Sequence, residues 1–195
     1  MATYLPPVEH PSNPLLKLVY LFSERLFGKV TTGTKVFAAR MPVAFLAFYS
    51  KTYRLDRKLK LPSRTAMLIR EHVATTNGCL FCMDTSRYFA IKASPDNAAR
   101  YDALPHYRTS PLISEAERAA LDYATELTRD KEVDPGTFAR LRQHFSEREV
   151  CDIVWLVASE HLANLTNIGL NIGSDGLCEI NLGRVAQPEP ARRVS

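Results

Sequence analysis

Residues 66–90 read AMLIREHVATTNGCLFCMDTSRYFA and contain two cysteines, Cys79 and Cys82, separated by two residues. The part before Asn77 has the composition of a helix, and Gly78 is a typical helix end because glycine adopts the left-handed conformation without strain. The part after the first cysteine again has helical composition. This stretch therefore predicts two helices joined by a tight turn, with the cysteine pair at the start of the second helix.

The two cysteines have the spacing of a reversible dithiol. Two residues between them allow their sulfurs to meet across one helical turn, and a helix start offers unpaired N–H groups and a positive dipole end. Both stabilise a thiolate, which is the nucleophilic form of cysteine. Buried cysteines also act as small hydrophobes. The spacing of Cys79 and Cys82 alone leaves both interpretations open.

The sequence supports a metal or cofactor site less than it supports a dithiol. A zinc site needs four ligands, whereas Cys151, Cys178 and five scattered histidines form neither a second CxxC nor an HxxxH. No GxGxxG follows a predicted strand, as a flavin or nicotinamide site would require. We therefore expect no bound metal or cofactor, and the electrons for a dithiol reaction would come from a partner.

The helix before the cysteines carries two groups that can transfer protons. Glu71 and His72 precede Cys79 by eight and seven residues. A dithiol reaction needs a base that accepts the proton of the attacking thiol and returns it to the leaving group. Either side chain reaches the sulfurs only if the two helices fold back on each other at the glycine turn; each is alternatively a surface residue.

Helix signals recur along the rest of the chain. Two capping boxes, at residues 114–117 and 146–149, pair a serine with a glutamate three residues later. No run of alternating β-branched residues predicts a strand, so we expect an all-α fold. The expected helices run from Pro14 to Gly28, from Pro42 to Leu55, from a cap at Ser63 to Asn77 and from Leu80 to Ala93, with further starts near Ser94, Ser114, Asp134 and Ser146.

The length and composition fit one globular domain. The chain has 195 residues, 46% hydrophobic and 24% charged. We expect a single all-helical domain over residues 12–183, with flexible tails at 1–11 and 184–195. The net charge of +4, from 25 basic and 21 acidic residues, is too small and too scattered to indicate nucleic-acid binding.

Targeting signals are not expected either. No stretch of about 18 apolar residues predicts a membrane span. The first residues, MATYLPPVEHPSNP, lack a basic segment followed by an apolar run, as a secretory signal would have. We therefore expect a cytoplasmic protein. Because thiols are kept reduced there, a close cysteine pair indicates catalysis or metal binding more than a structural disulfide.

Residues 66–90 resemble the core motif of the alkylhydroperoxidase D-like, or carboxymuconolactone decarboxylase, family. That motif has a glutamate twelve residues before a CxxC, an Asn-Gly just ahead of the first cysteine and a histidine four residues after the second. The resemblance implies an all-helical bundle that forms dimers, trimers or hexamers. It also implies that the CxxC pair reduces peroxides or disulfides, with Cys82 attacking and Cys79 resolving.

Two positions depart from the family motif. Met67 stands where the family has its glutamate, and Ser86 stands where it has its histidine. Glu71 lies one helical turn after Met67 on the same face, so it offers a carboxylate from a shifted position. Ser86 does not titrate near neutrality but can orient a water or a thiol. Alternatively His72, or Glu160 and His161 from the late helix, fills the gap.

We therefore predict a peroxidase-like thiol–disulfide oxidoreductase that receives electrons from a thioredoxin-like or lipoyl-bearing protein. The two departures favour an alternative, a binding or assembly protein that has kept the fold and lost the relay. A third possibility is a lyase like the decarboxylase branch, which generally lacks the CxxC pair. The presence of Cys79 and Cys82 argues against that branch.

Two side-chain stripes have more than one interpretation. Asn164, Asn167 and Asn171 recur on one face of the last helix, where they line a pocket, form a subunit contact or face solvent. Aromatic residues form either a helix packing face or a subunit interface. These aromatic residues are Phe37, Phe45, Phe48, Tyr49 and Tyr53.

Overall fold

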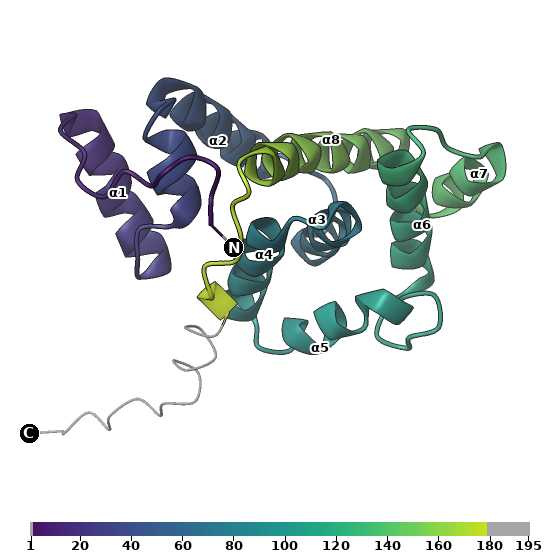
Figure 1. The fold of residues 1–195 in the computed structure, drawn as a ribbon. Coiled ribbons are helices and arrows are strands. Elements are labelled where there is room, and N and C mark those ends of the chain that lie inside the picture. Colours follow the sequence, from purple (N-terminus) through teal and green to yellow (C-terminus); the bar gives the residue numbers. More distant parts are fainter. Residues whose placement is uncertain (1, 179–195) are drawn as a thin grey trace, which may run out of the picture.

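The computed structural model of the chain describes residues 2–178, and Figure 1 shows an assembly of helices. In chain order the elements are α1 (Pro14–Phe27), η1 (Thr34–Ala38), α2 (Pro42–Asp56), α3 (Ser63–Asn77), α4 (Leu80–Ala93), α5 (Asn97–Asp102), η2 (Leu104–His106), α6 (Glu115–Arg129), α7 (Pro135–His144) and α8 (Glu147–Gly169). No strand occurs within residues 2–178, so the all-α prediction is confirmed. The tail expected at 184–195 lies outside the described residues.

Local end signals place the long helices where the sequence predicts them. Ser114 and Ser146 form complete capping boxes at the starts of α6 and α8. Gly28 and Gly78 end α1 and α3 with φ angles of 78° and 70°. Ser63, expected as the cap of α3, is instead its first helical residue, because the preceding proline takes the N-cap position.

Two short elements were not predicted. The π-helix η1 has five residues and the 3-10 helix η2 has three, which is too short for a periodic hydrophobic pattern. η1 packs against both α1 and α2, and its Val36 and Ala38 are fully buried. Its conformation therefore depends on tertiary contacts that no local signal encodes.

Helix α3 lies at the centre of the main core, where α4, α6 and α8 contact it (Figure 1). Eight of its 15 residues are buried, and these include the polar residues Glu71 and His72. A helix contacted on three sides buries more of its circumference than an amphipathic surface helix does. The central position of α3 is therefore what removes both side chains from water.

Helices α1 and α2 form a smaller lobe with η1 beside this core (Figure 1). Leu16, Val19 and Tyr20 of α1 pack against Ala38 in a separate hydrophobic cluster. By contrast, α2 buries none of its residues. Its aromatic rings stack on one another and on Phe37 of η1, and Phe45 also packs against the α1–η1 cluster. The ring centroids of neighbouring pairs lie 4.6–6.4 Å apart, for Phe37–Phe45, Phe45–Tyr49 and Phe48–Tyr49.

Residues 2–11 contain no helix and run along the molecule. The backbone N–H of Tyr4 donates to the carbonyl of Leu170, and that of Val8 donates to the carbonyl of Lys35. These bonds attach the segment to the end of α8 and to η1. The hydroxyl of Tyr20 adds a further bond to the carbonyl of Val8.

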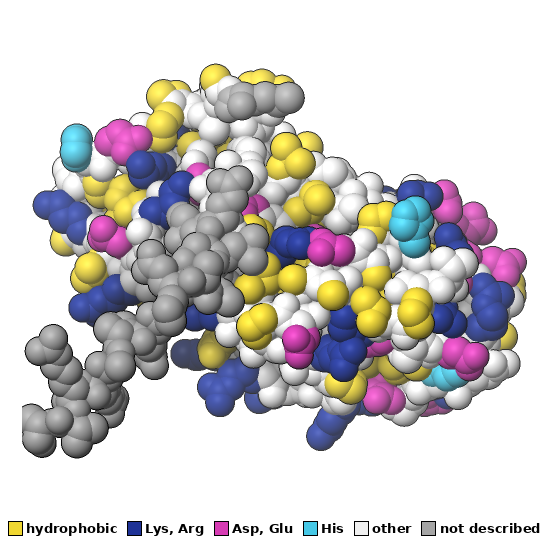
Figure 2. Space-filling model, turned by 90° about the horizontal axis from the view of Figure 1, so that it is seen from below, with side chains coloured by type: hydrophobic (Ala, Val, Ile, Leu, Met, Phe, Trp, Pro, Cys, Tyr) yellow, Lys and Arg dark blue, Asp and Glu magenta, His cyan; other side chains and the backbone are white. Residues whose placement is uncertain are grey.

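The molecular surface carries charges of both signs. On the face shown in Figure 2, Lys and Arg side chains alternate with Asp and Glu side chains and with apolar ones. None of the helices within residues 2–178 combines the length and the apolar character that crossing a bilayer requires.

Candidate redox site

The turn between α3 and α4 brings the two cysteines together. Gly78 ends α3 in the left-handed conformation, and the N–H of Cys79 donates to the carbonyl of Ala74 at 2.9 Å. Cys79 is the N-cap residue of α4, and Cys82 lies in the first turn of that helix. Their sulfurs are joined in a disulfide, with the Cα atoms 5.3 Å apart. The structure thus pairs the two predicted cysteines.

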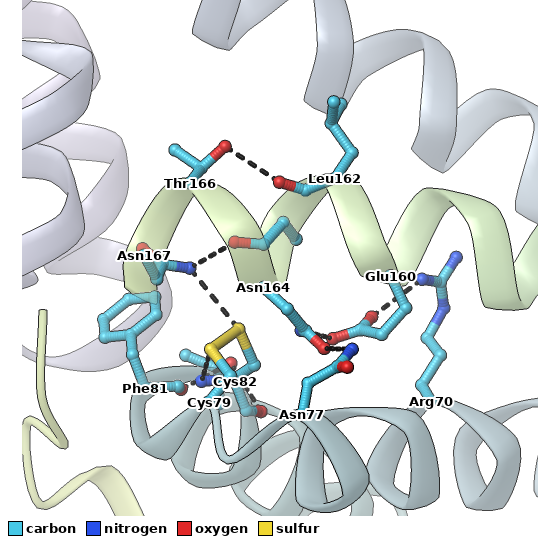
Figure 3. Close-up of a disulfide and its surroundings, with 12 residues drawn as sticks. Arg70, Asn77, Cys79, Phe81, Cys82, Glu160, Leu162, Asn164, Thr166 and Asn167 are labelled. Atoms are coloured by element: carbon cyan, nitrogen blue, oxygen red, sulfur yellow. Dashed lines mark hydrogen bonds and ion pairs between the residues drawn. A yellow bond between two sulfur atoms is a disulfide. The ribbon is translucent and has the colours of Figure 1, made fainter. Parts of the chain in front are cut away.

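Each sulfur of the disulfide has its own N–H donor. The backbone N–H of Cys82 donates to Sγ of Cys79 at 3.3 Å, and the side-chain amide of Asn167 donates to Sγ of Cys82 at 3.4 Å (Figure 3). Cys79 is 1% exposed and Cys82 is 5% exposed, with Ala74 and the partly buried Phe81 packed against them. The sulfurs are therefore shielded from water but polarised by donors.

Helix α8 covers the disulfide with amide side chains (Figure 3). Asn77, in the last turn of α3, donates to Oδ1 of Asn164 at 2.8 Å, and Asn164 donates to Oε1 of Glu160 at 2.8 Å. Of the asparagine stripe, Asn164 and Asn167 therefore line the site. Asn171 instead lies beyond the end of α8 and donates to the carbonyl of Ala2.

The polar chain continues from the buried Glu160 into a partly buried ion-pair network. Arg70 of α3 contacts Oε2 of Glu160 at 3.0 Å and Oδ2 of Asp56 at 2.7 Å. The indole N–H of Trp155 donates to the other oxygen of Asp56. Burial raises the pKa of Glu160, and the Arg70 guanidinium opposes that rise. Arg70 and Asp56 were not predicted, because their partners lie far away in the sequence.

Glu71 of α3 belongs to a second buried group, together with Ser86 of α4. The side chain of Glu71 is buried, and its Oε2 atom has no hydrogen-bond partner within the described residues. Burial raises the pKa of Glu71 to about 8, while the Ser86 hydroxyl lowers it. Ser86 lies one helical turn, about 6 Å, beyond Cys82 on the same face of α4. The structure therefore brings Glu71 together with Ser86, which lies one turn beyond Cys82 on α4.

Tyr101 is the third member of this buried group. Its hydroxyl donates to the backbone carbonyl of Met67 at 3.1 Å and lies 3.5 Å from the Ser86 hydroxyl. Burial raises the pKa of Tyr101, so the phenol stays protonated at neutral pH. The tyrosine was not predicted as a site residue, because it lies 15 residues after Ser86, on α5.

His72 faces a different part of the molecule. Its Nε2 atom lies 2.7 Å from the Thr125 hydroxyl on α6, and its ring lies edge-on to Tyr107. Burial lowers the pKa of His72 to about 4, so the imidazole is neutral at pH 7. The structure does not bring His72 to the sulfurs, and a proton-transfer role for it remains an untested prediction.

The remaining two cysteines lie apart from the disulfide as free thiols. Cys151 is exposed on α8, whereas Cys178 donates from its sulfur to the backbone carbonyl of Asp84. The Asp84 carboxylate accepts bonds from residues 174–178 and holds that segment on α4. Within residues 2–178, no group of three or more His, Cys, Asp or Glu side chains is arranged to hold a metal ion.

Sequence comparisons find relatives whose own activity is not known. No protein-family model matches the chain. The chain is 27% identical over 158 residues to the uncharacterized protein YnjA of Escherichia coli (strain K12), covering 80% of this chain and 86% of YnjA. It is 28% identical over 108 residues to the uncharacterized protein YdfG of Bacillus subtilis (strain 168), covering 54% and 73%.

Solved structures share the fold over most of its length. The debrominase Bmp8 superposes with a TM-score of 0.76 at 22% identity, covering 95% of this chain and 99% of Bmp8. An alkylhydroperoxidase AhpD core protein, an uncharacterized peroxidase-related protein from Ralstonia eutropha JMP134, has a TM-score of 0.71 at 22% identity, covering 89% and 96%. ATU0492 of Agrobacterium tumefaciens, a protein of unknown function, has a TM-score of 0.63 at 26% identity, covering 71% and 94%. The chain therefore has the alkylhydroperoxidase D-like fold that its cysteine motif predicts.

Proposed function

We propose that the protein is a peroxidase-like thiol–disulfide oxidoreductase, which uses Cys79 and Cys82 to reduce a hydroperoxide or a disulfide. The observation that carries this proposal is the Cys79–Cys82 disulfide at the start of α4, with an N–H donor on each sulfur. Backbone donors and the helix dipole at that position stabilise the thiolate that the chemistry needs.

The proposed reaction begins from the reduced pair. The Cys82 thiolate attacks the peroxide oxygen, the O–O bond breaks, and the alkoxide takes a proton and leaves as an alcohol. The Cys79 thiol then attacks the sulfenic acid on Cys82, forms the disulfide and releases water. One dithiol and one hydroperoxide thus give one disulfide, one alcohol and one water. Cys82 is assigned to the first step because it is the more exposed of the two residues.

Glu71 is the proton-transfer group of this proposal. With a pKa of about 8, its carboxyl is mostly protonated at pH 7 and can donate to the leaving alkoxide. The resulting carboxylate can then accept the proton of Cys79 before the resolving attack. The carboxyl interacts with Ser86, which lies one helical turn beyond Cys82, so it would exchange protons with the sulfur through one intervening water. Ser86 would orient that exchange from the same side.

The oxidised pair must be reduced again by a partner. We assign this role to a thioredoxin-like or lipoyl-bearing dithiol protein, whose thiolate attacks the disulfide and leaves oxidised after exchange. The reducing cytoplasm is the compartment that supplies such donors. The catalytic cycle then needs no bound cofactor.

A stoichiometric oxidation assay tests the proposal. The reduced protein is mixed with cumene hydroperoxide, and thiols and cumyl alcohol are quantified. We expect one alcohol per Cys79–Cys82 disulfide, no reaction after Cys82→Ser, and an unchanged result after Cys151→Ser, which removes an exposed thiol outside the pair. Peroxide reduction that persists in the double Cys79→Ser, Cys82→Ser variant would exclude the mechanism.

Reductive debromination is a second candidate function. The observation that favours it is the likeness to Bmp8 over 95% of this chain, including a variant of Bmp8 solved with 2,3,4-tribromopyrrole. A dithiol supports this reaction: the carbon–bromine bond is replaced by carbon–hydrogen, bromide and a proton leave, and the pair is oxidised to a disulfide. Incubation of the reduced protein with a bromopyrrole should then release one bromide per disulfide, and no release would discard this candidate.

We further propose that the protein acts as a homo-oligomer. α2 buries none of its residues, and large apolar side chains on α1, α2 and α8 are exposed, including Phe22, Val43, Tyr53 and Leu165. Apolar surface on neighbouring helices is typical of subunit interfaces. Light scattering after gel filtration should give a mass above the 21.9 kDa of one chain, and a single-chain mass would refute assembly.

A further inference from the structure

The amide of Asn167 has a fixed orientation next to the disulfide (Figure 3). Its Nδ2 atom donates both to Sγ of Cys82 at 3.4 Å and to the carbonyl of Ala163, one helical turn earlier, at 2.9 Å. The opposite side of the amide faces Gly33, where an added Cβ would lie 3.5 Å from Oδ1. The bond to Ala163 therefore directs the nitrogen, rather than the oxygen, at the sulfur.

Helix α8 is itself held in register with the cysteine turn. Asn164 accepts from Asn77, two residues before Cys79, and donates to Glu160. Arg70 of α3 pairs with Glu160 at 3.0 Å. These bonds join α8 to α3 at Asn164 and one helical turn earlier, at Glu160, so we expect the Asn167 amide to keep its place when the sulfurs separate.

We propose that Asn167 stabilises the thiolate of Cys82 after the disulfide opens. A hydrogen bond to the charged form of a group lowers its pKa. The start of α4 already supplies this for Cys79, through the N–H of Cys82 and the helix dipole. α8 supplies the equivalent donor for the second sulfur, so either sulfur can leave as a thiolate. The proposal deepens the proposed dithiol function, but the thiolate can be measured without any substrate.

The charged side chains on α3, α4 and α8 do not take the place of the Asn167 amide as a hydrogen-bond donor to Cys82. Glu71 on α3 and Glu160 on α8 are carboxyl groups, and a carboxylate near a thiol raises the thiol's pKa instead of lowering it. Arg70 lies on the far side of Glu160 and is paired with it, and Asp84 on α4 is satisfied by residues 174–178. Among these groups, Asn167 is the one whose polar hydrogen contacts Cys82.

The test is the pKa of Cys82 in a Cys79→Ser background, where serine keeps the helix cap and a single thiol avoids coupled titration. The pKa is read from the pH dependence of iodoacetamide alkylation, with the label quantified by mass spectrometry on peptide 71–87. We expect Asn167→Leu to raise the pKa by about 1–2 units, as loss of a hydrogen bond to a charged group implies. Asn167→Asp, which adds a negative charge, should raise it at least as much.

Matched controls separate a local effect from a general one. Asn171→Asp adds the same charge beyond the end of α8, where the side chain contacts the Ala2 carbonyl, and should leave the pKa of Cys82 unchanged. In a Cys82→Ser background, Asn167→Leu should leave the pKa of Cys79 unchanged.

An unchanged pKa of Cys82 in both folded Asn167 variants would overturn the proposal, and circular dichroism confirms the fold. The result is independent of the proposed function. A Cys82 shift in a protein that reduces no hydroperoxide would uphold the role of Asn167 and reject the peroxidase. Hydroperoxide turnover without the shift would do the reverse.

Discussion

Replacing Glu71 by glutamine is the sharpest perturbation of the site. Glu71 is 5% exposed, one of its carboxyl oxygens lacks a hydrogen-bond partner within the described residues, and its pKa is about 8. Glutamine has nearly the same shape as the protonated acid but does not titrate. The substitution therefore removes the charge of the ionised form and keeps the packing of α3 against α4.

The size of the effect follows from the pKa of Glu71 in the two states. Between pH 5 and 8 the folded protein keeps a proton on Glu71 that the unfolded chain, with a pKa near 4.5, has released. The free energy of unfolding of the wild type therefore falls as pH rises through this window. At about 1.4 kcal/mol per pH unit, the wild type loses roughly 3 kcal/mol of its free energy of unfolding between pH 5 and 8 relative to the glutamine variant.

Urea unfolding followed by circular dichroism at pH 5, 6, 7 and 8 measures this difference. Buried His72, with its lowered pKa, makes both proteins less stable as pH falls below 6.5, so its contribution cancels in the difference between them. Glu132→Gln, which removes an exposed carboxylate, is the control. If the free energies of unfolding of the wild type and of Glu71→Gln change in parallel with pH, Glu71 does not have a raised pKa in the folded protein. An unchanged rate of dithiol oxidation by hydroperoxide across pH 6–9 would remove Glu71 from the mechanism.

Three further predictions concern stability and are measured by urea unfolding at pH 7. Arg70→Met should lower the free energy of unfolding by about 3 kcal/mol, because it leaves Glu160 buried without its partner. Adding Glu160→Gln to the same chain should recover part of this loss, and no recovery would contradict the pairing. Gly78→Ala should lower the free energy of unfolding by about 1 kcal/mol, because φ is 70° at this position and alanine is strained there. An unchanged free energy of unfolding would show that the turn takes up another conformation. Ser146→Ala should cost about 1 kcal/mol through the lost capping box of α8, and a loss below a few tenths would show that the cap is redundant.

The fold was predictable where its signals are local. The ends of α1, α3, α6 and α8 depend on residues within four positions of each end, so capping residues and glycines locate them. The short helix η1 lacked such a signal, because its burial comes from α1 and α2. The helix ends therefore follow from local signals, whereas the site depends on contacts between residues far apart in the sequence.

The sequence points to several residues of the candidate site, but not to the contacts that bring them together. Spacing identifies Cys79 and Cys82, because both lie on one turn of α4. Asn167 and Arg70 belong to contacts that span 85 and 90 residues, to Cys82 and Glu160 respectively, and no periodic pattern reports contacts of that length. Glu71 is visible in the sequence, but its burial is a consequence of three helices surrounding α3.

The positions of Glu71 and Ser86 explain how the site can lack the family's glutamate and histidine. In the family motif, the glutamate stands one helical turn further from the cysteines, at the position of Met67, and a long histidine occupies the position of Ser86. Because α3 ends at the Gly78 turn, moving the carboxylate from residue 67 to residue 71 brings it about 6 Å closer to that turn along α3. The Ser86 hydroxyl of α4 interacts with the carboxyl at this position. Under the proposed function, the shifted Glu71 carboxyl and the Ser86 hydroxyl would together take over the role of the glutamate and the histidine of the motif.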